Sequence, residues 1–128
     1  MMDDVTTLYR PTGEAELALV SESGYTAWPE RLPEQPFFYP VANEEYAVQI
    51  ARDWNAGRNS NGYVTEFDVE TPYLARFEPR VVGDSRTHVE YWVPAEELTE
   101  FNAHLVGRIR VTRAFRGDPP VEVPVDIE

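Results

Sequence analysis

Polar and apolar residues alternate along several short segments of the chain, and this spacing is typical of β-strands with one face toward a core. The clearest segments are 5–10, 63–69, 88–93 and 107–115, and shorter candidates lie at 37–41 and 80–82. We expect Pro11 to end the first strand, because proline cannot donate a hydrogen bond in a ladder. Turns are expected at 57–62 and 83–84, where small and polar residues gather.

Segments whose apolar residues recur at helical spacing lie between these strands. Thr12 is expected to cap a helix from about Gly13 to Gly24, with Leu17 and Val20 facing inward. Thr71 and Pro72 predict a short turn of helix, and Pro94 is expected to start another.

The strongest helical pattern follows Asn43, which is a typical N-cap residue. Four apolar residues then recur at helical spacing and predict one buried face: Ala47, Ile50, Ala51 and Trp54.

Short helices interleaved with strands and hairpin-length turns predict an α+β fold with a mainly antiparallel sheet and two to four short helices. Residues 1–116 are expected to form one domain, because 128 residues suffice for a single core. Three prolines indicate an irregular loop over 25–36, and residues 117–128 read as an acidic, proline-rich tail. Within that tail Val121, Val123 and Val125 alternate, so an edge strand is the alternative.

The composition narrows the functional classes. Acidic residues outnumber arginines by 23 to 11, lysine is absent, and the net charge is −12. Such a surface repels nucleic acid and anionic membranes, unless the protein is itself a nucleic-acid mimic. Without cysteine there is no thiol chemistry, and two histidines exclude a histidine-rich metal site. No apolar run is long enough to span a membrane, and we expect a cytoplasmic protein.

Glu90 is the leading candidate for chemistry. Alternation along 88–93 places His88, Glu90 and Trp92 on one face of the strand and Val89, Tyr91 and Val93 on the other. A carboxylate between an imidazole and an indole is partly desolvated, a setting that suits either a strained structural residue or a functional acid.

The order of these parts resembles the ADP-ribosyltransferase fold. Leu8-Tyr9-Arg10-Pro11-Thr12 is similar to the first motif, in which a basic residue ends the first strand. Phe38-Tyr39 resembles the second motif, and Glu90-Tyr91-Trp92-Val93 resembles the third, a strand that bears a glutamate. The chain also resembles a small bacterial group that carries the label "ADP-ribosylation/crystallin J1".

The resemblance implies NAD as substrate and cleavage of the bond between nicotinamide and ribose, with transfer of ADP-ribose to an acceptor or to water. It implies Glu90 as the catalytic carboxylate near the ribose and Arg10, followed by Thr12, as the clamp for a phosphate or ribose oxygen. The aromatic platforms for nicotinamide would be Tyr39, Tyr46 or Trp92.

Each residue also has a purely structural interpretation. Glu90 would then pair with Arg108, Arg110 or Arg113, Arg10 would be a surface arginine, and the tyrosines would be packing residues. The alternative function is a non-catalytic binding module on the same fold, of the immunity or inhibitor type, whose acidic surface binds a basic protein.

Overall fold

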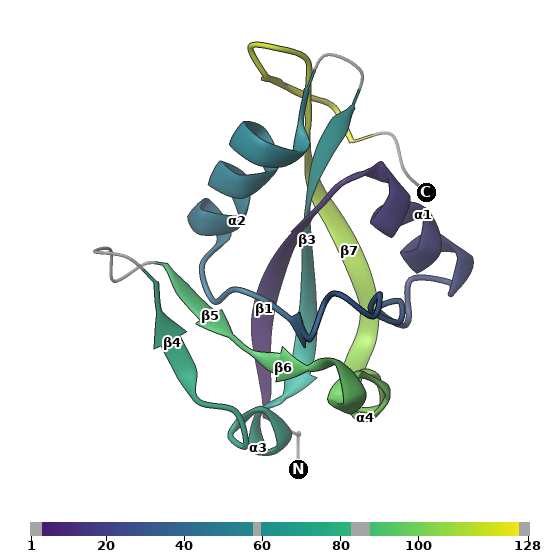
Figure 1. The fold of residues 1–128 in the computed structure, drawn as a ribbon, viewed down its shortest axis with the longest axis vertical. Coiled ribbons are helices and arrows are strands. Elements are labelled where there is room, and N and C mark those ends of the chain that lie inside the picture. The colour runs from purple at the N-terminus through teal and green to yellow at the C-terminus, as the bar shows by residue number, and fades with distance from the viewer. Residues whose placement is uncertain (1–3, 58–59, 83–87, 126–128) are drawn as a thin grey trace.

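The computed structural model describes residues 4–57, 60–82 and 88–125. Its main sheet has four antiparallel strands in the order β1-β3-β7-β8. These are β1 (Val5–Thr12), β3 (Asn61–Glu70), β7 (Leu105–Arg116) and β8 (Val121–Val123). Figure 1 shows the first three running side by side through the middle of the molecule.

The first strand continues through Pro11, contrary to the prediction from sequence, and Pro11 pairs with Val64. The Tyr9 amide donates to the carbonyl of Val41, on the side of β1 away from β3. Because alternate residues of a strand turn their amides the same way, the nitrogen of Pro11 also faces away from β3. The proline therefore costs no hydrogen bond of this ladder.

Two short strand pairs lie beside β1. β2 (Phe37–Phe38) pairs with β6 (Val93–Pro94), and β4 (Pro79–Val81) pairs with β5 (Val89–Tyr91). The single strand predicted over 88–93 is thus divided between β5 and β6. Val41 bridges Tyr9 on one side and Glu90 on the other, so β5 continues the main sheet beyond β1.

The helices are α1 (Glu14–Glu22), α2 (Glu44–Ile50), the π-helix η1 (Ala51–Asn55), α3 (Thr71–Leu74), the 3-10 helix η2 (Ala95–Glu97) and α4 (Leu98–Ala103). The Asn43 cap is confirmed, because its side chain accepts a hydrogen bond from the amide of Tyr46. The Thr12 cap is wrong: Thr12 ends β1, and Gly13 precedes α1 without a side-chain cap.

Trp54 is also placed wrongly by the helical pattern, since 80% of its surface is exposed. Ala47 and Ala51 are buried as expected, but η1 follows directly. The wider turn of a π-helix changes the angle between successive side chains, and Trp54 consequently turns away from the face that Ala51 buries.

The core lies between the main sheet, α1, α4 and the loop 25–36. Aromatic rings dominate its centre, with Trp28 against Phe38 and Phe67, and Phe38 against Phe101. Leu17 and Val20 of α1, and Leu98 and Phe101 of α4, are buried as their spacing predicts. The irregular loop is therefore anchored, because it delivers the buried Trp28 to the core.

The chain is an α+β protein whose strands pair antiparallel throughout the described segments. Within the tail, the alternative of an edge strand is confirmed, because β8 pairs with β7. The turn expected at 83–84 lies outside the described residues, as do residues 58–59 of the expected turn at 57–62. Among the described helices none is both long and apolar enough to cross a membrane.

Candidate functional site

A cleft of about 430 Å³ opens beside β1, where β5 and the end of α2 approach it. Its walls come from five parts of the chain: Arg10 and Pro11 of β1, Tyr39 and Val41 after β2, Ile50 and Asn55 around η1, Glu90 of β5, and Trp92. Four of the residues proposed from the sequence therefore meet here, namely Arg10, Tyr39, Glu90 and Trp92. The volume lies within the range of small-molecule sites.

Glu90 is held by two neutral donors. The Tyr46 hydroxyl donates to its Oε2 atom at 2.6 Å, and the Trp92 indole Nε1 donates to its Oε1 atom at 3.1 Å. No arginine lies within ion-pairing distance of this carboxylate in the part of the chain that the structure describes, so pairing with Arg108, Arg110 or Arg113 is excluded. Glu90 is thus an oriented, half-buried carboxylate that forms no ion pair within the described segments.

The predicted face of the 88–93 segment is confirmed by these contacts. The His88 ring stacks on Tyr46 at 4.3 Å between centroids and an angle of 15°, while Glu90 and Trp92 reach each other on the same side. Burial, with Glu90 beside the hydroxyl, raises the pKa of Tyr46 to about 12. The phenol is therefore a stable donor at neutral pH.

Tyr46 does not line the cleft, although the resemblance suggested it as a nicotinamide platform. One face of its ring is covered by His88, and its hydroxyl is committed to Glu90. In this structure Tyr46 orients the carboxylate.

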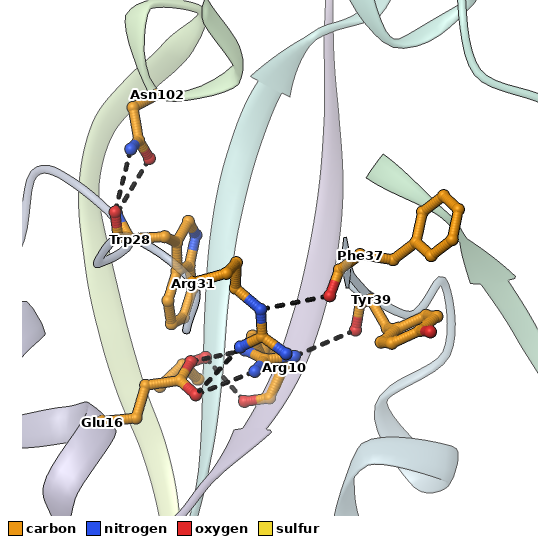
Figure 2. A network of polar contacts seen from close by, with 8 residues as sticks. Arg10, Glu16, Trp28, Arg31, Phe37, Tyr39 and Asn102 are labelled. Atoms are coloured by element: carbon orange, nitrogen blue, oxygen red, sulfur yellow. Dashed lines mark hydrogen bonds and ion pairs between the residues drawn. The ribbon is translucent and has the colours of Figure 1, made fainter. Parts of the chain in front are cut away.

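Arg10, which lines the cleft, also belongs to a polar network (Figure 2). Its Nε and Nη2 atoms donate to the two oxygens of Glu16 at 2.5 and 2.8 Å, and Nη1 donates to the carbonyl of Tyr39 at 3.3 Å. Arg31 donates to the carbonyl of Phe37 and lies 3.9 Å from Glu16. The two donors on one edge of the Arg10 guanidinium are consequently bound to Glu16 of the same protein.

The network contains two guanidinium groups and one carboxylate, all largely buried. Arg10 also lies 4.7 Å from the ring centre of Phe38, where a cation–π contact partly replaces lost hydration. Burial and the neighbouring Arg10 lower the pKa of Arg31. The one excess positive charge of this network offsets the negative charge of Glu90 at the cleft, in a protein whose overall charge repels anions.

Tyr39 and Trp92 form an aromatic pair at the cleft wall, with ring centres 5.7 Å apart and planes nearly perpendicular. Arg80, which stands opposite Glu90 in the β4–β5 pair, lies 4.4 Å from the ring centre of Trp92. Thr12 is 1% exposed and does not line the cleft, and its hydroxyl has no partner among the described residues.

Sequence reasoning missed Glu16, Arg31, Ile50 and Asn55 as parts of the site. Glu16 carried no distinct signal, because acids are common in the first turn of a helix. Ile50 was assigned to the core. Asn55 carried no signal, because a polar residue near a helix end is ordinary. No group of histidine, aspartate and glutamate side chains within the described segments has a metal-binding arrangement.

A second cavity of about 410 Å³ lies at the opposite end of β1, around Tyr73, Arg76 and His104. The two ring nitrogens of His104 face Glu70 and Glu100 at 2.6 and 3.1 Å, and the hydrogen bond to Glu70 raises the pKa of this histidine. His104 is thus already paired with carboxylates, whereas Glu90 forms no ion pair with any residue that the structure describes.

The fold and the cleft define an α+β protein with one oriented acid in a small aromatic cleft. Comparison with family models, with curated proteins and with solved structures finds no match to the chain.

Proposed function

We propose that the protein binds NAD in this cleft and cleaves the bond between nicotinamide and ribose, as an ADP-ribosyltransferase-like enzyme or an NAD glycohydrolase. One observation carries the proposal. Arg10, Tyr39 and Glu90, which the resemblance selects from three distant segments, line a single cavity together with Trp92.

Breaking this bond builds positive charge on the ribose while nicotinamide leaves with the bonding electrons. A carboxylate held beside the sugar stabilises that transition state more than the ground state. Glu90 suits this role because its two oxygens are fixed by Tyr46 and Trp92, neither of which neutralises it. The same carboxylate would accept a hydrogen bond from a ribose hydroxyl.

The ring of nicotinamide requires a flat apolar contact. Tyr39 and Trp92 supply aromatic surface in the cleft, and both rings lie near Glu90 in the fold. The network formed by Arg10, Glu16 and Arg31 carries one excess positive charge, which would offset the repulsion between Glu90 and the pyrophosphate. The acceptor of ADP-ribose, whether a protein or water, is left open by this proposal.

The test is nicotinamide release from NAD by the wild-type protein and by Glu90→Gln. The amide keeps the shape of the side chain and removes its charge, so we expect release to fall about 100-fold or more. Glu96→Gln is the matched control, because Glu96 is exposed on η2 and does not line the cleft. Equal release by wild type and Glu90→Gln would contradict the proposal.

A non-catalytic acidic binding module is the second candidate. The observation in its favour is the bidentate pair between Arg10 and Glu16. Two donors of Arg10, the residue that the first motif assigns to a phosphate or ribose oxygen, are thereby already used within the protein. Two other observations oppose it: Glu90 is in no ion pair with another described residue, and no residue of 29–36 lines the cleft. If calorimetry detects no binding at millimolar NAD, a basic protein partner becomes the better hypothesis.

A further inference from the structure

Trp54 is the feature that the proposed function leaves unexplained. Its indole is 80% exposed, the largest exposed fraction among the large hydrophobic residues of the described segments. A flat apolar ring presented to water gains free energy when another ring covers it. The π-helix that turns it outward is a form of helix often found at functional sites.

Trp54 is not itself a lining residue of the cleft, but residues on either side of it along the chain are. Its neighbour Asn55 lines the cavity, and so does Ile50, four residues earlier on the same helical segment. Side chains four positions apart on a helix lie on nearly the same face, and the wider π-helical turn moves Trp54 away from Ala51, three positions earlier, rather than from Ile50. The Trp54 ring therefore follows Ile50 toward solvent.

Asn55 lies at the end of the cleft away from Glu90. Glu90 is level with Tyr9, because both pair with Val41. Pro11, which shares the cavity with Asn55, is two residues further along β1, or about 7 Å at strand spacing. An extended dinucleotide with its nicotinamide ribose at Glu90 would therefore bring its second base toward η1.

Asn55 supplies a polar group beside Trp54. Its side-chain oxygen is buried and accepts no hydrogen bond from the described residues. The terminal torsion of asparagine is soft, so the carboxamide can turn to accept a hydrogen bond from an exocyclic amino group.

We infer that Trp54 and Asn55 form the binding subsite for the adenine base of the dinucleotide, with the indole stacking on the base and the carboxamide reading its amino group. The inference rests on the proposed function for the identity of the ligand. Adenine is uncharged, so the acidic residues of the protein do not oppose its binding at this end of the cleft.

Two half-ligands separate this inference from the proposed function. ADP-ribose contains the adenine and lacks nicotinamide, whereas nicotinamide mononucleotide contains the nicotinamide ribose and lacks adenine. Calorimetry of Trp54→Ala should show about tenfold weaker binding of ADP-ribose, the loss expected for one stacked base, with unchanged binding of the mononucleotide. Because Trp54 is exposed, the variant should remain folded.

Two controls make the result specific. Trp54→Phe keeps an aromatic face and should retain most of the affinity for ADP-ribose. Leu19→Ala removes an apolar side chain that is half exposed on α1 and should leave both ligands unaffected. Equal affinity of wild type and Trp54→Ala for ADP-ribose would overturn the inference alone, and binding of neither half-ligand would overturn it together with the proposed function.

Discussion

Tyr46 shows how a single residue prepares the acid of the candidate site. Its amide is fixed by the Asn43 cap, its ring by stacking on His88, and its hydroxyl by Glu90. Burial disfavours the charged phenolate, and ionisation would also place a second negative charge 2.6 Å from the carboxylate, so the pKa of Tyr46 is raised.

The raised pKa predicts a specific alkaline titration. A tyrosine whose pKa is about 12 in the folded protein and near 10 when unfolded stabilises the fold below pH 10, and this contribution is lost as the pH rises through 12. Ultraviolet titration should resolve a late fraction that contains Tyr46 and Tyr73, whose pKa is also about 12. Tyr46→Phe should remove one equivalent and leave that of Tyr73; an unchanged late fraction would contradict the assignment.

The contact between β3 and η1 depends on a residue without a side chain. A Cβ atom on Gly62 would lie 2.1 Å from the carbonyl oxygen of Ala51, which is backbone and has no flexible end to move. The π-helix therefore packs directly on the strand. This close approach fixes η1 against β3, and with it Asn55, which lines the cleft.

Gly62→Ala should accordingly destabilise the protein by about 3 kcal/mol, at the upper end of overpacking effects. Gly13→Ala is the matched control, because a Cβ atom there meets nothing within 4 Å. Its cost should be about 1 kcal/mol or less, from the N-cap preference for glycine over alanine. Urea unfolding of the two variants measures the difference, and similar midpoints would show that η1 yields to the added methyl group.

The elements that sequence predicted best are those in which one face is buried. Alternation placed His88, Glu90 and Trp92 correctly on one face, and helical spacing identified Leu17, Val20, Leu98 and Phe101 as buried. Trp54 and Pro11 were misplaced for a different reason. Local pattern does not reveal a change of helix type, nor which side of a strand lacks a partner.

At the scale of the whole molecule, the cleft is assembled by strand pairing between distant segments. The sequence indicated Arg10, Tyr39, Glu90 and Trp92 individually, and the structure brings them together. The sequence could not indicate that Glu16 would accept hydrogen bonds from the Nε and Nη2 atoms of Arg10, because that contact depends on how α1 turns back over β1. The ADP-ribosyltransferase-like fold and the role of each site residue remain predictions.

The bridge at Val41 has a consequence for how the protein opens. Within the described residues, backbone hydrogen bonds join the β5 segment to the main sheet through residues 40–42: Val41 is bonded to Tyr9, Ala42 to Val89, and Tyr91 to Pro40. By contrast, β3 is paired along nearly its whole length on both sides. These few backbone hydrogen bonds can break while the rest of the main sheet stays paired.

Hydrogen exchange should therefore separate two cooperative units. The amides of Ala42 and Tyr91 are expected to exchange through a partial opening of lower free energy than the central amides of β3, and a common opening free energy would argue for a single unit. Glu90 would belong to the unit that opens first. Substitutions near residues 40–42 would then change how often the cleft opens by local unfolding without changing the melting temperature of the protein.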